Sequence, residues 1–517
     1  MRSPLVLPAL VGSVLGLAVR LLVATRREGI EVDGILYLAN AAALAGDLTR
    51  FNAVHQPLYS LVLAAVGPLG GDPEWVGRVV AAVAGGLWVW PALWLARETT
   101  EAPVAWPAGL LVALMPSAVE AGTRVLPDTL LGLLMTATLA SCVWAARTGS
   151  AAAAAVTGAL GALAALAHPV GAGSLAAALV LVALARHWAP PAWPRARPLV
   201  APAALALAAG LVLVPQIVLV HEATGSWSWT GKRLGYTLTF SEHVGDERPV
   251  AAAERLTSGV RAEEAPAGAL AYAWRHPAGL ARRALVNLHL VDKYTLPGLL
   301  QSGGLVLVAL GLARLRWRRP RPEWVLPVAL LPLGTLLLLN VESRYFVPAL
   351  PVLAVIAALG VVRLGGPRPR RRGGRVSPLG VAALALVLLS CVPWLVRPWF
   401  REDPSAVDRA AGRWLRAEAG LGGAFLGRYP VIGYYAGARD IPLGARGLEE
   451  ALADGRRQGA RFLVVDSVRT PEVRPDLLPL LGGGVPARPE LRLATTIEDR
   501  AGRRVLIYRI LPPGGAA

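Results

Sequence analysis

Charge, and lysine in particular, is scarce in this sequence. Only 17% of its 517 residues are charged, against about 25% in soluble proteins, and Lys232 and Lys293 are its only lysines. So little charge cannot cover a globule of this size, which excludes an ordinary soluble enzyme. The two cysteines, Cys142 and Cys391, lie in apolar stretches, which excludes a disulfide framework.

Familiar metal and nucleotide signatures are missing as well. The sequence contains no HExxH, no cysteine pair with zinc-ligand spacing and no phosphate-cradling GxxxxGK[ST]. These absences argue against zinc proteases and nucleotide hydrolases.

What the sequence does contain is apolar residues with arginines between them. Apolar residues make up 55% of the chain, and the mean hydropathy is +0.50. A membrane-spanning helix needs about 20 mainly apolar residues, and eleven windows are predicted to span. They are 5–24, 76–96, 103–119, 125–146, 150–167, 171–187, 199–220, 297–313, 323–341, 345–363 and 377–396. A further apolar run, 57–70, is too short to span and is predicted to be re-entrant or interfacial.

The arginines predict the orientation. Eleven of them lie in two short connections, 314–321 and 363–375, and such clusters gather on the cytoplasmic side. We therefore expect a multi-pass protein of the cytoplasmic membrane with its N-terminus inside and the loops 25–75 and 221–296 outside. The net charge of +18 then reflects topology, and we expect no nucleic-acid partner.

The residues after 396 change character. A helical pattern over 408–418, around Trp414 and Leu415, and a helix-like run over 446–458 alternate with short strand-like runs at 424–426, 461–466 and 505–510. Such alternation is typical of a small α/β domain. We predict a polytopic α-helical membrane domain over 1–396, followed by a soluble extracytoplasmic α/β domain over 397–517.

Polar side chains at the predicted outer margin are costly and therefore informative. Asp33, Tyr37 and Asn40 are spaced so that they share one helix face. Asp33 is either a helix N-cap residue or a functional carboxylate at the positive end of the helix. Arg78 either extends to water as a margin residue or binds a lipid phosphate.

Other candidates stand at the same margin, each with a structural alternative. Asp128 follows Pro127 at a helix opening, and His168 is either a turn histidine or a ligand. The remaining candidates are His55, Tyr59, Arg124, Glu342, Arg344 and Tyr345.

In combination these residues resemble a known group of membrane enzymes. The motifs are Asp33-Gly-x-x-Tyr37 with Gly46-Asp47, His55-Gln-Pro57-Leu-Tyr59, Arg78, Pro127-Asp128, Thr224-Gly225-Ser-Trp227 with Gly231-Lys232, Glu342-Ser-Arg344-Tyr345 with Pro348, Tyr429-Pro430, and Tyr434-Tyr435-Ala436-Gly437. The chain resembles a GT-C glycosyltransferase of the family 39 type, the class of protein O-mannosyltransferases and bacterial aminoarabinose transferases. The order of these motifs along the whole chain carries the resemblance, because each motif by itself is short.

The resemblance implies the GT-C fold and an inverting transfer from a polyprenyl-phosphate sugar to a lipid, glycan or protein acceptor, with no metal and no other cofactor. Asp33 is then the general base, and Asp128 orients acceptor or sugar hydroxyls or holds the base. Cations that receive the donor phosphate are Arg78, Arg344, Arg124 and Lys232; substrate-binding residues are Tyr37, His55, Tyr59, His168, Glu342 and Tyr345.

Two other functions compete with this interpretation. A transporter or lipid flippase tends to show related halves and broken helices near the midplane, and no convincing repeat is visible here. A GT-C-like assembly protein without catalysis is the second alternative. The presence of both Asp33 and Asp128 argues against it.

Overall fold

The structure is a computed structural model, and it divides into two compact units. The residues that it describes are 5–100, 104–190, 193, 199–231, 273–315, 321–339, 342–364, 376–427, 429–443, 447–468, 470–471, 474–482 and 490–512. Unit 1 comprises the described residues of 5–25, 36–231 and 281–397, and unit 2 those of 26–35, 273–280 and 398–512.

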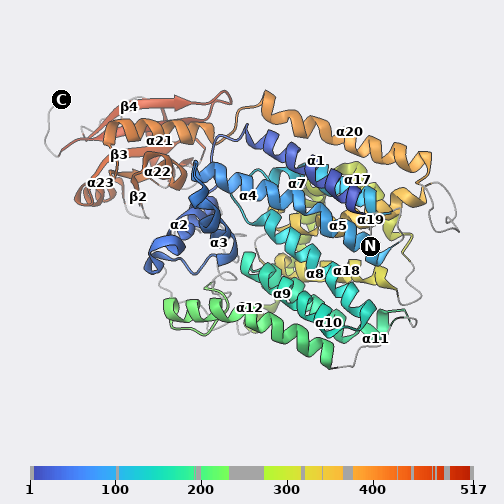
Figure 1. The fold of residues 1–517 in the computed structure, drawn as a ribbon. Helices are drawn as coiled ribbons and strands as arrows, with labels where there is room; N and C mark the ends of the chain where they lie inside the picture. The colour runs from blue at the N-terminus through green and yellow to red at the C-terminus, as the bar shows by residue number, and fades with distance from the viewer. Residues whose placement is uncertain are drawn as a thin grey trace. The chain divides into compact units, whose positions relative to one another are not determined.

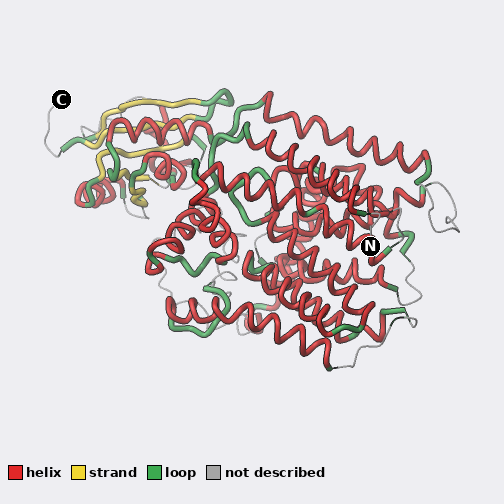
Figure 2. Tube along the Cα trace, viewed as in Figure 1, coloured by secondary structure: helices red, strands yellow, loops and turns green. Residues whose placement is uncertain are grey.

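Unit 1 is helical, as Figure 2 shows by colour. Its α-helices are α1 (Val6–Ala24), α2 (Val32–Gly46), α3 (Pro57–Val66), α4 (Pro73–Leu87), α5 (Val89–Thr99), α6 (Ala105–Leu114), α7 (Pro116–Ala121), α8 (Asp128–Thr148), α9 (Ala151–Ala167), α10 (Gly171–Ala183), α11 (Ala185–Trp188), α12 (Val200–Thr224), α16 (Pro277–Leu290), α17 (Leu296–Leu312), α18 (Val325–Leu330), α19 (Leu350–Arg363) and α20 (Pro378–Phe400). Shorter 3-10 segments are η1 (Leu48–Arg50), η2 (Gly67–Leu69), η6 (Pro322–Trp324), η7 (Leu331–Leu338) and η8 (Ser343–Ala349), and η5 (Val291–Thr295) is a π-helical turn. α2, α16 and α20 each continue from one unit into the other.

The helical membrane architecture predicted from the apolar windows is confirmed, although the count of eleven spans is not. Among the described residues, seven helical stretches are long and apolar enough to cross a membrane. Other predicted windows form shorter pieces. The window 103–119 breaks into α6 and α7 at Met115, directly before Pro116, and 323–341 becomes η6, α18 and η7. The segment 57–70 is helical, and its place in the bilayer stays a prediction.

The break between α6 and α7 is stabilised from α1. Pro116 has no N–H to give to the carbonyl of Val112, which is thereby left without its helical partner. Arg20, completely buried, donates to the carbonyl oxygens of Val112 (3.1 Å) and Ala113 (3.0 Å), and also to Gly16 (2.9 Å). Since an unsatisfied carbonyl in hydrocarbon costs several kcal/mol, this arginine makes the broken helix tolerable.

Glycines make room for the Arg20 side chain. A Cβ atom on Gly85 of α4 would lie 2.4 Å from its Nε, and one on Gly122, after α7, would lie 2.5 Å from its Cδ. Both positions are therefore restricted to glycine as long as Arg20 lies between these segments. Four elements, α1, α4, α6 and the end of α7, thus meet around the Arg20 side chain.

Unit 2 contains a five-stranded mixed sheet. Its strands are β1 (Ala424–Gly427), β2 (Arg439–Pro442), β3 (Ala460–Asp466), β4 (Leu491–Glu498) and β5 (Arg504–Ile510), in the order β2-β1-β3-β5-β4. β1 is parallel to β2 and β3, whereas β5 is antiparallel to β3 and β4. The helices are α21 (Ala406–Ala419), α22 (Pro430–Ala436) and α23 (Leu448–Arg457), with a 3-10 segment η9 (Pro475–Gly482).

Helices cover both faces of this sheet (Figure 1). On one face Phe462 and Ile507 pack with Leu415 of α21 and Ile432 of α22. The opposite face, which includes Leu463 and Tyr508, packs with α23 and η9. Both cores are made of side chains that alternate along the strands, as expected for a sheet buried on two sides. The helix runs predicted over 408–418 and 446–458 and the strand runs predicted at 424–426, 461–466 and 505–510 are thus confirmed.

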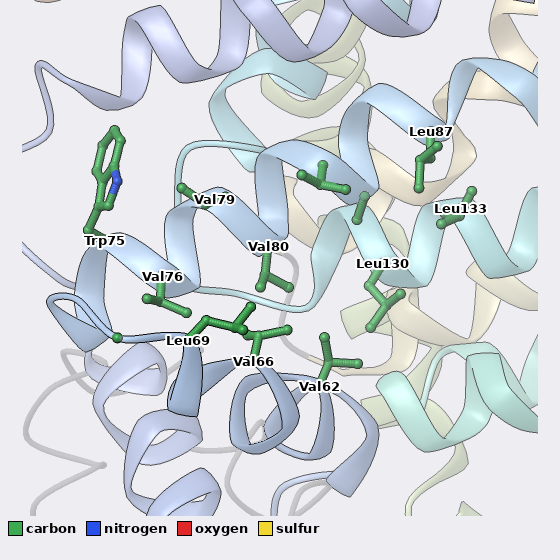
Figure 3. A pocket seen from close by; sticks show the side chains of 13 residues that line it. Val62, Val66, Leu69, Trp75, Val76, Val79, Val80, Leu87, Leu130 and Leu133 are labelled. Carbon is green, nitrogen blue, oxygen red and sulfur yellow. The ribbon is translucent and has the colours of Figure 1, made fainter. Parts of the chain in front are cut away.

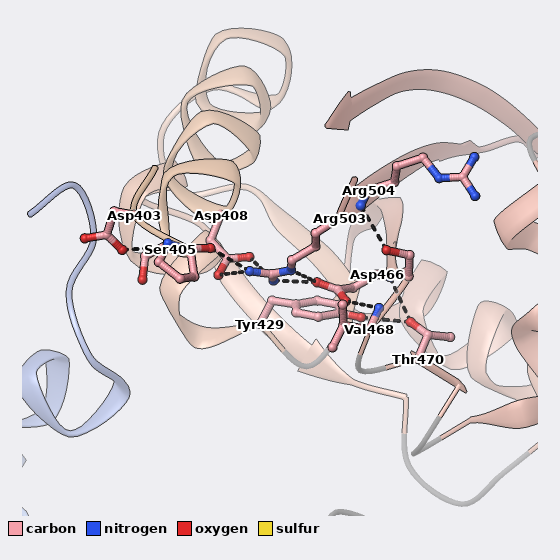
Figure 4. Close-up of polar contacts among 11 residues, drawn as sticks. Asp403, Ser405, Asp408, Tyr429, Asp466, Val468, Thr470, Arg503 and Arg504 are labelled. Atoms are coloured by element: carbon pink, nitrogen blue, oxygen red, sulfur yellow. Dashed lines mark hydrogen bonds and ion pairs between the residues drawn. The ribbon is translucent and has the colours of Figure 1, made fainter. Parts of the chain in front are cut away.

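A charge cluster joins the start of α21 to the sheet (Figure 4). Arg503 pairs with Asp408 of α21 at 2.6 Å and with Asp466 at the end of β3, and it donates to the carbonyl oxygen of Pro404 at 2.8 Å. Burial alone would lower the pKa of Arg503, but the two carboxylates outweigh this effect and raise it. The arginine therefore stays charged and holds the residues before α21 against the sheet.

Candidate active site

Asp33 lies in the first turn of α2, which begins at Val32. The carboxylate is partly exposed, and it lies where the unpaired N–H groups of a helix favour negative charge. Tyr37 follows one turn later on the same face of α2, so one helix carries the predicted base and a predicted substrate residue.

An aromatic cluster surrounds Tyr37. Its ring packs edge-on against His55 at 5.2 Å and against Tyr59 at 5.4 Å, measured between ring centroids. The Tyr59 hydroxyl donates to the carbonyl oxygen of Gly77 in α4, and the Ser60 hydroxyl donates to that of Tyr37, both at 3.0 Å. The structure thus brings three predicted substrate-binding residues together and fixes α2 and α3 against α4.

Arg78 follows Gly77, the residue that accepts the hydrogen bond from Tyr59. It is buried in α4 and has a partner that was not among the predicted site residues. Its guanidinium pairs with the carboxylate of Glu74, one helical turn earlier, and both side chains are more than nine-tenths buried. A glutamate four residues before an arginine is a favourable helical pair, so the spacing alone would have predicted this contact. Arg78 is thereby held in one position as a buried cation.

Two further candidates lie around α7 and α8. Arg124, in the connection between these helices, pairs with Glu120 of α7 at 2.5 Å. Asp128 follows Pro127 as the first residue of α8 and is 5% exposed. Its position at a helix start agrees with the structural alternative for this residue, and its burial shows that the carboxylate faces the protein interior.

A second cluster joins α9 to η8. The rings of His168, which follows α9, and Tyr345 lie 5.5 Å apart. The guanidinium of Arg344 lies 5.0 Å from the centre of the Tyr345 ring and donates to Glu342 at 2.6 Å. The Nδ1 atom of His168 accepts from the N–H of Val170, so the neutral ring carries its proton on Nε2. Four predicted site residues are therefore in one place.

Helix packing connects the two clusters. α7 contacts both α4, which carries Arg78, and η8, which carries Arg344, and α8 contacts the same two elements. The approach is close, because a Cβ atom on Gly77 would lie 2.6 Å from the side chain of Val125. Three predicted phosphate-binding arginines, each paired with a glutamate, thus come from packed elements of unit 1. Lys232, the fourth predicted cation, lies outside the described residues.

A cavity of about 430 Å³ lies between α3, α4 and α8 (Figure 3). Its lining is apolar and includes Val62 and Val66 of α3, Trp75 and Val80 of α4, and Leu130 of α8. The lining face of α4 is the one turned away from the Glu74–Arg78 pair. This cavity is suited to an apolar chain, since its lining is almost entirely apolar.

Gln56 is a buried polar residue that the sequence analysis missed. It precedes α3, is 1% exposed, and neither atom of its carboxamide has a hydrogen-bond partner among the described residues. Its position between His55 and Pro57 was the available signal. Among the same residues, no group of three or more His, Cys, Asp or Glu side chains is arranged to hold a metal ion.

Comparison with known proteins gives this arrangement a context. Residues 54–217 match the family described as dolichyl-phosphate-mannose-protein mannosyltransferase. The structure is similar to that of ArnT from Cupriavidus metallidurans bound to undecaprenyl phosphate, with a TM-score of 0.60 and 15% identity over 96% of this chain and 97% of that one. The fold is that of a GT-C glycosyltransferase. No curated protein sequence matches the chain.

The GT-C fold extends to a second neighbour. The archaeal oligosaccharyltransferase AglB from Archaeoglobus fulgidus, in complex with an inhibitory peptide and a dolichol-phosphate, gives a TM-score of 0.53 and 14% identity over 88% of this chain and 69% of that one. The Archaeoglobus fulgidus oligosaccharyltransferase in complex with zinc and sulfate gives a TM-score of 0.58 and 13% identity, over 96% of this chain and 72% of that one. The matched family and these neighbours are glycosyltransferases, so the resemblance predicted from the sequence is confirmed at the level of the fold.

Proposed function

We propose that the protein transfers a sugar from a polyprenyl-phosphate donor to an acceptor hydroxyl, with inversion at the anomeric carbon. The observation that carries this proposal is the set of glutamate-paired arginines on packed elements beside an aromatic cluster, in a fold shared with enzymes whose structures hold undecaprenyl phosphate or dolichol-phosphate. Arginine suits a phosphate because its planar group makes two parallel hydrogen bonds.

In the proposed reaction, the Asp33 carboxylate takes the proton from the acceptor hydroxyl. The hydroxyl oxygen attacks the anomeric carbon as the bond from that carbon to the phosphate oxygen breaks, and the polyprenyl phosphate leaves with the electron pair. A hydroxyl is a poor nucleophile, so a positioned base is required. The leaving group gains negative charge, which Arg78, Arg124 and Arg344 stabilise.

The other candidate residues receive supporting roles in this proposal. Asp128 orients sugar or acceptor hydroxyls, and the rings of Tyr37 and Tyr59 line the substrate site. The polyprenyl chain takes the apolar cavity lined by Val66 and Leu130. The reaction is proposed to occur at the outer face of the cytoplasmic membrane, on the side opposite the arginine-rich connections, with the N-terminus inside and residues 397–517 outside.

Sugar transfer from radiolabelled polyprenyl-phosphate sugars by the purified protein tests the proposal. Asp33→Asn should lower kcat by about 100- to 10,000-fold, the usual contribution of a general base. Asp72→Asn, which changes an exposed acid at the start of α4, is the matched control and should retain full activity. Undiminished transfer by Asp33→Asn would disprove the assigned base, and no transfer from any donor by the unaltered protein would favour a transporter or an assembly role.

A further inference from the structure

The backbone just before α2, which belongs to unit 2, is held by side chains from the C-terminal part of the same unit. The N–H of Ile30 donates to the Tyr435 hydroxyl at 3.0 Å, and that hydroxyl donates to the carbonyl oxygen of Glu28 at 3.4 Å. Arg409 of α21 donates to the same carbonyl oxygen at 2.9 Å, and its guanidinium lies over the Tyr435 ring at 5.3 Å. One tyrosine and one arginine therefore bind two consecutive peptide groups on either side of Gly29.

Two residues that precede α21 hold the same segment as well. The N–H of Glu28 donates to the Asp403 carboxylate at 3.0 Å. A Cβ atom on Gly29 would lie 2.1 Å from the Cβ of Ser405, so a larger residue does not fit there. We call Glu28, Gly29 and Ile30 the anchor segment. Both backbone polar groups of Glu28 and the N–H of Ile30 are bonded to side chains that come from the other end of the chain.

The residues that hold the anchor segment are themselves fixed. Asp403 accepts from the N–H of Ser405 at 2.9 Å, and the carbonyl oxygen of Pro404 accepts from Arg503, which is bound to Asp408 and Asp466 (Figure 4). The contacts on the anchor segment therefore lead directly into the buried charge cluster of the sheet.

We propose that these contacts within unit 2 position the catalytic base, with Tyr435, Arg409 and Asp403 as positioning residues for Asp33, which lies in the same unit. Ile30 lies three residues before Asp33, and three residues of chain extend over about 10 Å at most, so the anchor segment limits where α2 begins. A displacement of about 1 Å at a reacting group can cost 100-fold in rate. This inference rests on the proposed function, because it requires Asp33 to act as the base.

Tyr435→Phe tests the inference, with Tyr429→Phe as the matched control. Both variants remove one hydroxyl from unit 2, but the Tyr429 hydroxyl bonds to Thr470 inside the unit. For Tyr435→Phe we expect hydrogen exchange at the Ile30 amide to increase about tenfold, and kcat to fall about tenfold with the donor KM unchanged within twofold. Tyr429→Phe should change neither quantity.

A second pair guards against a folding defect in the first. Arg409→Met removes the bond to Glu28, whereas Arg413→Met changes an exposed arginine one turn further along α21. Arg409→Met should reproduce the loss of kcat, and Arg413→Met should not.

The outcomes separate the inference from the proposed function. Faster exchange at Ile30 with unchanged kcat would overturn the positioning role, and so would an equal loss of kcat in both members of a pair. Undiminished transfer by Asp33→Asn would instead overturn the assignment of the base, while exchange at Ile30 would still report whether Tyr435 and Arg409 hold the anchor segment.

Discussion

Arg503 offers the sharpest test of how unit 2 is stabilised. It forms two hydrogen bonds to Asp408, at 2.6 and 3.2 Å, and two to Asp466, one of them at 2.8 Å. The side chains of Asp408 and Asp466 are 7% and 0% exposed. Arg503→Met keeps much of the side-chain length but leaves two carboxylates buried without their cation.

The expected magnitude follows from this geometry. Removing one partner of a buried ion pair costs about 3–5 kcal/mol, because the remaining charge stays desolvated. Each 1 kcal/mol lowers the melting temperature of a small domain by about 4 °C or more, so the melting temperature of unit 2 should fall by at least about 12 °C. Adding Asp466→Asn to Arg503→Met removes one stranded charge and should recover part of the loss.

The assay is hydrogen exchange, resolved by mass spectrometry, in peptides from β3 and β5 of the full-length protein in detergent as the temperature is raised. Peptides from α8 in unit 1 serve as the internal control and should be unaffected. The anchor segment should become more exposed to exchange in the same variant, since Arg503 also holds Pro404. A decrease of less than about 2 °C in Arg503→Met, or a double variant less stable than the single one, would refute this reasoning.

Two more predictions concern other ion pairs. Glu74→Gln leaves Arg78 without its carboxylate partner in the free enzyme, and the donor phosphate would supply a new anionic partner. The KM for the donor should therefore fall about tenfold, while the stability of the protein decreases. A raised KM for the donor would instead show that Glu74 orients Arg78 for the donor. The Arg474 guanidinium lowers the pKa of Asp476 below its ordinary value. The stabilisation of unit 2 by the Arg474–Asp476 pair is therefore present above pH about 4 and lost as the pH falls further. It amounts to at most about 1 kcal/mol, because the Asp476 side chain is half exposed. Asp476→Asn should flatten this acid-side loss in melting curves of unit 2 between pH 3 and 6, and an unchanged acid limb would contradict the assignment.

The sequence predicted those elements whose burial leaves an apolar run. β3 and β5 are buried along almost their whole length, and the spanning windows follow hydropathy directly. β4 was not predicted, because less exposed side chains alternate with exposed ones along it and Thr495 and Thr496 are among them. No apolar run therefore marks this strand. The break of the helix at Met115 was not predicted, because the apolar run continues through Pro116 without a change in hydropathy.

The site was predictable in its residue types more than in its contacts. The i, i+4 spacing of Glu74 and Arg78 predicts that they pair on one helix face. Glu342, Arg344 and Tyr345 are close together in the sequence, so their contacts are predictable as well. The contact of His168 with Tyr345 joins elements far apart in the chain, and no spacing rule gives it. The anchor segment gives no signal at all, because its own backbone groups make the bonds.

The buried Arg20 has a consequence for how the protein is made. Its carbonyl acceptors on Ala113 and Val112 are synthesised 93 and 92 residues later. An arginine within a spanning helix costs up to about 3 kcal/mol, so the newly inserted α1 would direct this side chain toward the nearest membrane surface. Only when α6 and α7 arrive can the guanidinium turn inward. Although it is made before α6 and α7, α1 thus reaches its final packing only after them, and biogenesis has to keep it accessible until then.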